Sequence, residues 1–543
     1  MSRAAGRFLG SSRLLIGVLA ACAVIAVFSA SSAFAGVVPT DRGPVRGVET
    51  PTLTKYLGIP YAAPPVGDLR WRPPEPHARW HAPLDATQFG NHCPQPGSPF
   101  GRASTTEDCL YLNVFTPNAK TARGVGSGNG LARKRLPVMV WIHGGALAVG
   151  ESDDYDPTKL VEKGTVVVSL NYRLGWLGFL AHPALSAESR YNGSGDYGLM
   201  DEQAALRWVK RNIARFGGNP NDVTIFGQSA GGLSVHSQLA SPLAAGLFQR
   251  GIAQSGAYAL DLPSLASAEG TGSTFAQNEG CSDPTTVPAC LREVSVGNIL
   301  AIQPTTTGSV LPNIDGHVLP QSIKSAFDSG SFNRVPMVEG NTHDEFSLFA
   351  ALNVEFVFGQ LPPSLYPLVI NTFVSTVGLN VSPAALIAEY PVSTYGNSVG
   401  RALTAIGTDA LFACPGRRAS QALSRYVPTY SYEFNDPNAP QLFIGPASFP
   451  YHAYHGSEVQ YLFDIPNQTG APGLNTDQQA LADTMQTYWT KFAAAGDPNT
   501  AGEPSWPQFT VADDAYQSLQ PRSPVTITGF AADHKCAFWD AHQ

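Results

Sequence analysis

The feature that most constrains this chain is FGQSAGG, residues 226–232. The preceding residues, DVTIF (222–226), are apolar and β-branched, which predicts a short buried strand. The following residues, GGLSVHSQLA (231–240), predict the start of a helix. A serine in a tight turn between strand and helix is lifted out of the sheet, and the flanking glycines let neighbouring backbones pass close. The segment therefore predicts Ser229 as a nucleophile.

Other strand-like runs are spread along the chain, and several are apolar throughout, as in strands covered on both faces. They are 137–142, 165–172, 250–256, 335–342 and 429–435. Between the second of these and the serine turn, residues 201–216 place apolar side chains on one helical face. Alternating strands and helices predict an α/β fold with a mostly parallel central sheet and helices on both faces. No shift in composition marks a second domain, so we expect a single domain over residues 36–543.

The N-terminus has the pattern of a signal peptide. Three arginines precede an apolar run from Leu14 to Phe28, and an A-x-A site follows at residues 33–35. This predicts a leader of residues 1–35, cleaved before Gly36, and a secreted or periplasmic mature protein. LAAC, ending at Cys22, resembles a lipoprotein cleavage box, but the apolar run continues past it, so lipoprotein anchoring is less favoured. An uncleaved membrane anchor is the third alternative.

Composition excludes several classes of protein. Apolar residues make up 43% of the chain and charged residues 14%, which is not the composition of a disordered protein. The net charge of -8 argues against a nucleic-acid partner. Beyond the leader no stretch is long and apolar enough to span a bilayer, so no stable membrane insertion is expected after its removal. Nothing in the sequence predicts the oligomeric state.

The chain has seven cysteines, and removal of the leader with Cys22 leaves six. An even number in an oxidising compartment predicts disulfides, but six cysteines allow fifteen pairings and composition does not choose among them. The six are Cys93, Cys109, Cys281, Cys290, Cys414 and Cys536. None is in a CxxC pair or has a histidine at ligand spacing, so no metal site is predicted.

A serine nucleophile needs donors for the oxyanion, a base, and an acid that orients the base. WIHGGALAVG (141–150) follows a predicted strand and turns through two glycines, which exposes backbone amides. A further donor is the N–H of the residue after the nucleophile, Ala230. The acid and the base should follow the serine in the chain.

Two later segments offer the acid and the base. EGNTHDEFSLF (339–349) contains Asp344 and Glu345, beside His343. YHAYHGSEVQYLF (451–463) contains His452 and His455. Spacing alone leaves both choices open, Asp344 or Glu345 for the acid and His452 or His455 for the base.

These segments resemble the type-B carboxylesterase/cholinesterase family of α/β-hydrolases, over nearly all of the mature chain. Motifs similar to those of the family are YLGIPYAAPPVGDLRWRPP (56–74), EDCLYLNVFTP (107–117), NYRLGWLGFL (171–180), GLMDEQAALRWVKRNIARFGGNPNDVTIFGQSAGG (198–232) and CAFWD (536–540). The motifs occur in the family's order, which makes chance similarity a poor explanation.

The resemblance implies a role for each matching residue. Ser229 matches the nucleophile, Glu345 the acid and His455 the base. The matching oxyanion donors are Gly145, Ala146 and Ala230. The implied mechanism needs no metal and no cofactor.

The chain departs from the family pattern at two positions. The family usually has three glycines in the oxyanion loop, and here the third is Ala146, which keeps its N–H but narrows the space beside it. The family commonly has glutamate before the serine, and Gln228 removes that charge. Any role of a carboxylate at this position therefore does not carry over.

The resemblance also implies disulfides between consecutive cysteines: Cys93–Cys109, Cys281–Cys290 and Cys414–Cys536. Choline-hydrolysing members bind their cationic substrate against a tryptophan in the first of these loops. Here that loop is short and lacks tryptophan, and its only aromatic residue is Phe100. We therefore expect a serine carboxylesterase that acts, through an acyl-enzyme, on uncharged esters of small to medium size.

Two alternatives are weighed against this expectation. Some members are adhesion proteins that keep the fold and lose the serine, but Ser229, Glu345 and His455 are all present here. A carbamate, thioester or lipid ester would use the same triad, so the sequence does not separate these substrates from simple esters.

Overall fold

A computed structural model describes residues 33–118, 135–283, 285–303 and 311–542. Most of the expected leader, including Cys22, lies outside the described residues, so its cleavage and the alternative anchors stay predictions. No helix in the described ranges has both the length and the apolar character needed to cross a bilayer.

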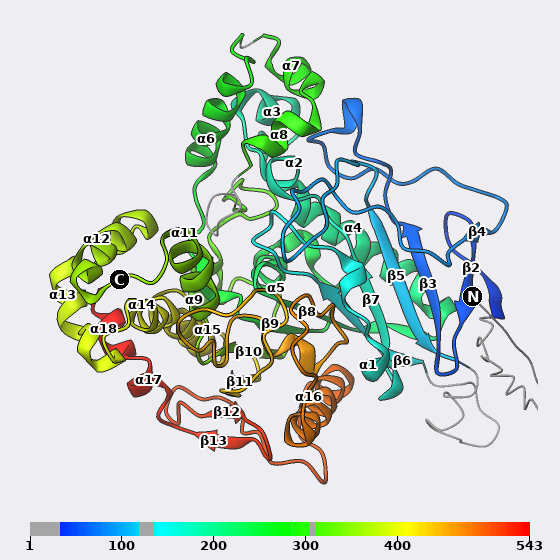
Figure 1. Ribbon diagram of the computed structural model, residues 1–543. Coiled ribbons are helices and arrows are strands. Elements are labelled where there is room, and N and C mark those ends of the chain that lie inside the picture. Colours follow the sequence, from blue (N-terminus) through cyan, green and yellow to red (C-terminus); the bar gives the residue numbers. More distant parts are fainter. Residues whose placement is uncertain (1–32, 119–134, 284, 304–310, 543) are drawn as a thin grey trace, which may run out of the picture.

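One twisted sheet of 13 strands organises the described residues (Figure 1). The strands are β1 (Ala33–Pro39), β2 (Pro44–Glu49), β3 (Leu53–Pro60), β4 (Leu84–Asp85), β5 (Tyr111–Pro117), β6 (Leu136–Ile142), β7 (Val166–Leu170), β8 (Gly218–Gln228), β9 (Arg250–Gln254), β10 (Met337–Thr342), β11 (Thr429–Phe434), β12 (Tyr516–Leu519) and β13 (Val525–Ile527). Their order is β1-β2-β3-β5-β7-β6-β8-β9-β10-β11-β12-β13, with β4 paired to β2.

The centre of the sheet, from β7 to β12, is parallel throughout. β8 lies in the middle, where Ile225 is in register with Val140 of β6 and Gly251 of β9. Both ends are antiparallel: β1, β2, β3, β5 and β7 on one side, and the β12–β13 pair on the other. The expectation of a mostly parallel sheet is therefore confirmed.

Helices connect the strands and cover the sheet. They are α1 (Thr158–Glu162), α2 (Gly175–Phe179), α3 (Pro183–Glu188), α4 (Tyr197–Asn212), α5 (Ala230–Ala240), α6 (Leu265–Asn278), α7 (Val287–Glu293), α8 (Val296–Ala301), α9 (Ile323–Ser329), α10 (Ser347–Ala350), α11 (Phe356–Phe358), α12 (Tyr366–Val377), α13 (Pro383–Glu389), α14 (Val399–Thr408), α15 (Cys414–Leu423), α16 (Thr476–Ala495), α17 (Phe530–Asp533) and α18 (Cys536–Asp540). The helix expected at 201–216 is α4 followed by a 3₁₀ turn, Ile213–Phe216.

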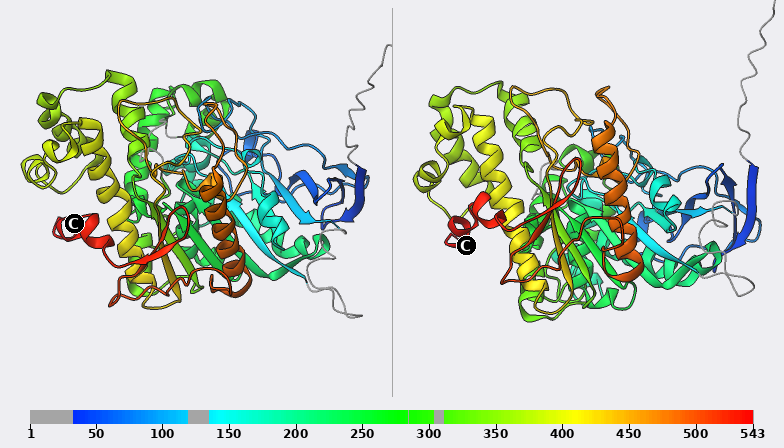
Figure 2. Two further views of the ribbon diagram at one scale, coloured as in Figure 1. Left: turned by 60° about the horizontal axis from the view of Figure 1, so that its bottom comes forward. Right: turned by 90° about the horizontal axis from the view of Figure 1, so that it is seen from below.

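The two faces of the sheet carry separate cores, because successive side chains of a strand point to opposite faces. In β6, Val138, Val140 and Ile142 join one cluster with α4 and α5. The intervening Met139 and Trp141 join another cluster with α1 and α16. Figure 2 shows α16, in orange, along one side of the strands. This arrangement confirms the expected helices on both faces.

A third cluster lies beyond the carboxyl ends of the central strands. It packs α10, α12, α13 and α14 around buried Tyr366, Ile370 and Ile406. A π-helix, Ala351–Glu355, joins α10 to α11. Beyond them, α12 and α13 stand apart from the sheet at the left of Figure 1. This layer covers the edge of the sheet at which β8 and β10 end, and it supplies one wall of the candidate site.

Candidate active site

Ser229 sits at the turn between β8, which ends at Gln228, and α5, which begins at Ala230. Its backbone is in an uncommon conformation for a residue with a side chain, at φ 58° and ψ -122°. Its N–H donates to the carbonyl of Gln254 on β9, at 2.8 Å, which fixes the turn against the neighbouring strand.

Close backbone packing explains the glycines on either side of Ser229. A Cβ at Gly227 would lie 2.5 Å from the carbonyl of Gly231, and one at Gly231 would collide with the carbonyl oxygen of Ile142. Only glycine fits at these two positions, so the strand and the helix can approach closely enough to present the serine. The expected strand–turn–helix geometry is present.

The loop that follows β6 runs beside Ser229. A Cβ at Gly144 would lie 3.1 Å from Cβ of Ser229, so the loop and the serine are in direct contact. Gly145 has φ 109° and Ala146 has φ 56°. Within the described ranges, the backbone N–H groups of Gly145, Ala146 and Ala230 donate to no protein acceptor. They are therefore available to a bound oxyanion.

Three contacts with residues that follow β7 fix the same loop in place. Tyr172 donates to the carbonyl of His143 at 2.9 Å, and the two rings stack at 4.5 Å. The carbonyl of Leu147 accepts from the N–H of Gly175 at 2.7 Å. Burial lowers the pKa of His143 to about 4, so this imidazole is neutral near pH 7. The loop is thus preorganised without a charge of its own.

Glu345 and His455 come together from separate parts of the chain. Glu345 follows β10, is fully buried, and accepts from the N–H of Thr342 at 2.8 Å. Its other oxygen, Oε2, lies 2.5 Å from Nδ1 of His455, which lies between β11 and α16. The rings of Phe349 and Phe412 pack against the imidazole at centroid distances of 5.0 and 5.1 Å. The orientation of the imidazole is therefore fixed both by the contact of Nδ1 with Glu345 and by packing against two aromatic rings.

The neighbouring candidates are placed elsewhere. Asp344 accepts from His343 at 3.0 Å, and His452 faces a backbone carbonyl, that of Pro437, at 3.3 Å. All three line a polar cavity that is separate from the one containing Ser229. Among the alternatives that spacing left open, the structure joins Glu345 with His455 and places Asp344 and His452 apart from them.

Ser229 and His455 line one pocket with about 1050 Å³ of empty space, part of it open to solvent. Gly145 and Ala146 lie in its wall. Most other lining side chains are apolar or aromatic: Pro99, Phe100, Val149, Tyr155, Leu348, Phe349, Leu352, Phe443, Val459, Ile465 and Pro466. The one acidic residue in the lining, Asp154, is paired with Arg102 at 2.8 Å. Such a pocket suits an uncharged ligand of small or medium size.

Comparison with known proteins agrees with this geometry. The model of the carboxylesterase family matches residues 35–539. The chain is 34% identical to the para-nitrobenzyl esterase of Bacillus subtilis over 511 residues, which is 90% of this chain and 96% of that protein. It is 34% identical to the fumonisin B1 esterase of Sphingopyxis macrogoltabida, over 87% of this chain and 84% of that protein. It is 32% identical to the human cocaine esterase, over 92% of this chain and 88% of that protein.

The chain belongs to the carboxylesterase family. It is therefore a carboxylic ester hydrolase with an α/β-hydrolase fold, as the resemblance implied. Small-molecule esters are the substrates of this family, and the pocket around Ser229 is where the described residues of this carboxylesterase could hold one.

This carboxylesterase contains three disulfides, which are the pairs that the resemblance implied. They join Cys93 to Cys109, Cys281 to Cys290, and Cys414 to Cys536. Protein disulfides persist in oxidising compartments. The long loop closed by Cys414 and Cys536 spans 122 residues and ties α18 to the start of α15.

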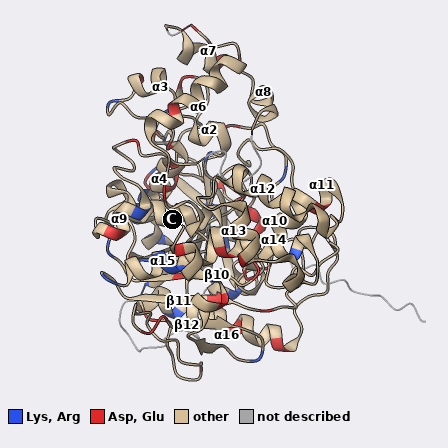
Figure 3. Ribbon diagram, turned by 90° about the vertical axis from the view of Figure 1, so that its left-hand side faces the viewer, with Lys and Arg blue, Asp and Glu red and all other residues tan. Residues whose placement is uncertain are grey.

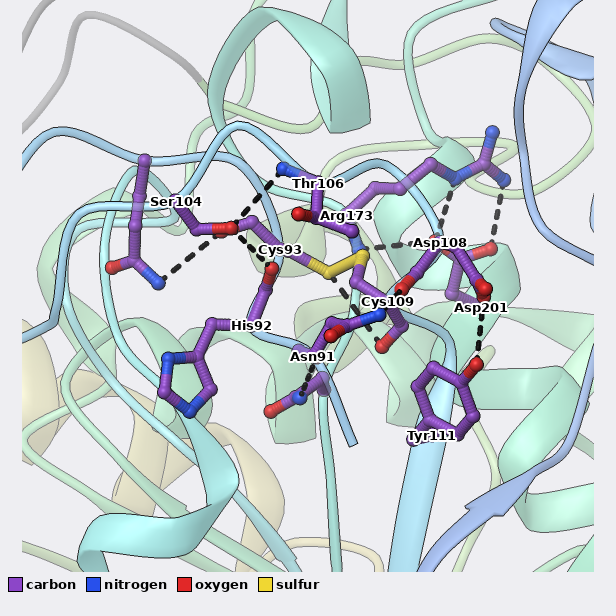
Figure 4. Close-up of a disulfide and its surroundings, with 12 residues drawn as sticks. Asn91, His92, Cys93, Ser104, Thr106, Asp108, Cys109, Tyr111, Arg173 and Asp201 are labelled. Atoms are coloured by element: carbon purple, nitrogen blue, oxygen red, sulfur yellow. Dashed lines mark hydrogen bonds and ion pairs between the residues drawn. A yellow bond between two sulfur atoms is a disulfide. The ribbon is translucent and has the colours of Figure 1, made fainter. Parts of the chain in front are cut away.

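The first disulfide loop is compact and braced (Figure 4). Ser104 donates to the carbonyl of His92 at 2.7 Å, and Asn91 donates to the carbonyl of Asp108 at 3.0 Å. Phe100, the aromatic residue singled out in the sequence, lines the pocket and packs against Phe443 at 5.3 Å. The loop therefore contributes a short apolar wall.

Two clusters of the described residues have the composition of metal sites: His343, Asp533 and His534, and His92, Glu151 and Asp153. In the first, both ring nitrogens of each histidine already face carboxylates. Burial alone would lower the pKa of His343, but its bonds to Asp344 and Asp533 outweigh burial and raise the pKa to about 11. In the second, the guanidinium of Arg102 supplies the positive charge. Both clusters are better described as ion-pair networks.

The sequence interpretation missed several pocket residues. Leu348, Phe349 and Leu352 follow Glu345 in the chain, and the apolar run FSLFAAL was a usable signal for a wall beside the acid. Phe412 lies in a π-helix, Asp409–Ala413, far along the chain, and Phe443 lies in an irregular segment. Neither carries a local pattern that would have placed Phe412 against His455 or Phe443 in the pocket wall.

Proposed function

We propose that this chain hydrolyses uncharged carboxylic esters of small to medium size by nucleophilic attack of Ser229 and formation of an acyl-enzyme. His455 Nε2 takes the proton from the Ser229 hydroxyl as the oxygen bonds to the ester carbonyl. Glu345 orients the imidazole and stabilises its cationic form. His455 then protonates the leaving alcohol, and water attacks the acyl-enzyme with His455 again as the base.

The oxyanion is assigned to the backbone amides of Gly145, Ala146 and Ala230. Support comes from their lack of protein acceptors and from the place of the first two in the wall of the Ser229 pocket. Donors fixed before the reaction stabilise the developing charge more than water does, because they need no reorganisation.

The observation that carries the proposal is the contact between Glu345 and His455 at one wall of the pocket that contains Ser229. A buried carboxylate bonded to Nδ1 favours the tautomer with its lone pair on Nε2, the nitrogen that faces Gln228, another residue of the pocket lining. In the present state no side-chain hydrogen bond joins Ser229 to His455 among the described residues, and bonds of this kind often tighten only with substrate.

The substrate class follows from the pocket. Its lining is apolar, its acidic residue is paired with Arg102, and the first disulfide loop has no tryptophan for a cationic head group. Relatives named for para-nitrobenzyl, fumonisin and cocaine esters indicate that the fold accepts varied esters. We propose highest kcat/KM for short-chain acyl esters and no preference for a choline ester over its neutral isostere.

The test compares Ser229→Ala with Ser255→Ala. Ser255 is a matched control because it is also buried and also has a positive φ, 53°, just after the neighbouring strand β9. Ser229→Ala should fold normally and lose essentially all esterase activity, while Ser255→Ala keeps it. A fluorophosphonate should label the wild type at Ser229, as read by peptide mass spectrometry. Substantial turnover by Ser229→Ala would overturn the proposal.

We also propose export of the mature chain, with cleavage after Ala35. Three disulfides and the N-terminal pattern support this location. N-terminal sequencing of the protein recovered from the medium or periplasm should begin at Gly36. A lipid-modified Cys22 would point to lipoprotein anchoring, and an intact N-terminus would point to a membrane anchor.

A further inference from the structure

Large exposed apolar side chains are concentrated in one short part of the chain. Twelve are found among the described residues, and six of these lie between residues 356 and 377. They are Phe356, Val357, Phe358, Leu365, Leu368 and Val377, and we refer to them as the 356–377 patch. Phe358 is 70% exposed, Val357 63% and Leu368 62%. Contiguous exposed apolar surface usually marks an interaction site.

The segment that carries the patch is free of charge. From Phe356 to Ala388 the sequence contains no Lys, Arg, Asp or Glu, although the whole chain has a net charge of -8. Figure 3 shows α12 without either charge colour. Glu355, at the boundary, is bonded through its carboxylate to the hydroxyl of Ser448 at 2.7 Å and to the N–H of the same residue. It is therefore tied back to the neighbouring loop.

Three of the four exposed polar side chains of α12 donate a hydrogen bond within the helix. Asn371 donates to the carbonyl of Pro367 at 2.7 Å, Thr372 to that of Leu368 at 3.1 Å, and Ser375 to that of Thr372 at 2.9 Å. A protein interface normally contains about one hydrogen bond per 100–200 Å², so a protein partner would need free donors and acceptors here. An apolar phase needs none, and it penalises any polar group left unsatisfied.

The patch is continuous with the pocket. Leu348, Phe349 and Leu352 line the pocket, and the same run of helix, α10 followed by the π-helix and α11, reaches Phe356 four residues later. A surface held by the patch would therefore contact a segment that continues into the wall of the pocket that contains Ser229.

We propose that the 356–377 patch docks this protein on an electrically neutral lipid surface. The absence of charge, the internal bonds of most polar side chains of α12 and the exposed aromatic and aliphatic side chains favour such a surface over a protein partner. The segment has no Lys or Arg to attract anionic head groups, so the attachment is apolar and not electrostatic. The proposal concerns adsorption and does not depend on the roles proposed for Ser229, Glu345 and His455.

The test is flotation with vesicles. Wild-type protein is mixed with phosphatidylcholine vesicles or with vesicles of phosphatidylcholine and phosphatidylglycerol. The patch variant combines Val357→Ser, Phe358→Ser and Leu368→Ser. A matched control removes one Phe and two other exposed apolar side chains elsewhere, by Val66→Ser, Phe89→Ser and Val511→Ser, at sites that are 46%, 39% and 50% exposed. Both variants are first checked for a wild-type Tm, and Phe358→Ser alone replaces the triple variant if it does not fold.

We expect wild type and control to float with phosphatidylcholine vesicles. The partition coefficient of the patch variant should be at least about tenfold lower than that of wild type, because each removed side chain contributes apolar transfer energy. Added phosphatidylglycerol should not strengthen binding. Equal flotation of patch variant and wild type, absence of wild-type binding, or a marked preference for anionic vesicles would each overturn the proposal. A wild-type dimer that the patch variant loses, without vesicle binding, would assign the patch to a second copy of the chain instead.

Discussion

The side-chain nitrogen of Gln228 lies 3.2 Å from Nε2 of His455, the ring nitrogen opposite the one that contacts Glu345. With the Nδ1 proton directed at Glu345, Nε2 carries the lone pair and accepts from the Gln228 amide. Gln228, the residue before Ser229, thus occupies the acceptor that Ser229 would use in the proposed mechanism. In the proposed mechanism, Gln228 must release Nε2 when Ser229 transfers its proton.

This contact predicts a shifted pH profile for Gln228→Glu. A carboxylate cannot donate to the lone pair, and its negative charge favours the protonated imidazole, which is inactive as a base. The pH at which kcat/KM falls to half on the acid side should rise by about one unit or more. The control is Gln468→Glu, which adds the same charge at the pocket wall at a residue bonded to Pro99. Equal midpoints for the two variants would mean that the Gln228 contact has no influence.

Glu345→Gln should be far more damaging than Asp344→Asn. The amide cannot stabilise the imidazolium and favours the wrong tautomer, so kcat should fall by about 10³–10⁴-fold. Asp344 contacts His343 and not His455, so its variant should keep most of the activity. Steady-state kinetics on a chromogenic short-chain ester measure both, and a reversed ranking would remove Glu345 from the proposed triad.

The same comparison applies to the two histidines. His455→Ala should abolish turnover, whereas His452→Ala should change it little, because His452 lines the separate cavity. Burst kinetics with a para-nitrophenyl ester would show whether either variant still acylates. A persistent burst in His455→Ala would contradict its proposed role as the base.

Glu458 should make the protein less stable as the pH rises. Burial and then the neighbouring Glu345 raise its pKa from 4.5 to about 8. For an acid whose folded pKa exceeds its unfolded value, the favourable contribution is complete below pH 4.5 and is lost as the pH rises through 8. Over this whole pH range the titration of Glu458 should lower the free energy of unfolding by about 5 kcal/mol at most.

Glu458→Gln should flatten that dependence. The amide oxygen can still accept from Gln254, which donates to Glu458 Oε1 at 3.1 Å. Urea denaturation of both proteins between pH 5 and 9 measures the difference. Parallel curves of unfolding free energy against pH would show that Glu458 does not titrate in this range.

Ala146→Gly should stabilise the oxyanion loop modestly. Ala146 has φ 56°, a conformation that glycine adopts without steric cost, so the gain should be about 0.5–1 kcal/mol. Ala148→Gly is the control, since Ala148 is buried and has no positive φ, and it should destabilise by roughly the same amount. Thermal unfolding shows whether each variant is more or less stable than wild type. A lower Tm for Ala146→Gly would show that the alanine methyl contributes packing.

Much of the fold was predictable because the central strands are apolar runs between helical patterns. Residues 137–142 and 250–256 correspond to β6 and β9 within two residues at each end. The antiparallel strands β1, β2, β3 and β5 were missed. They are as long as the central strands, but each contains Gly or Pro, and their pairing is decided by partners along the sheet.

Some residues of the candidate site were predictable from the local sequence, and others were not. Ser229 follows from local geometry, because strand, glycine turn and helix are contiguous in the chain. The choice between His452 and His455 does not, since an irregular segment carries both and only tertiary contacts orient them: one faces Pro437 and the other Glu345. Family resemblance supplied what periodicity did not. The contact between Gln228 and Nε2 of His455 had no sequence signal beyond the substitution itself.

The Cys414–Cys536 disulfide encloses His455 within a covalent ring of the chain, while Ser229 and Glu345 lie outside it. A protease that cuts once between residues 415 and 535 therefore opens the ring without releasing a fragment. Both pieces remain joined through sulfur, and His455 stays attached to the part of the chain that holds Ser229. In an extracellular setting, where proteases are common and repair is not, a single nick in the exposed residues after α16 would leave one molecule, separable only by reduction.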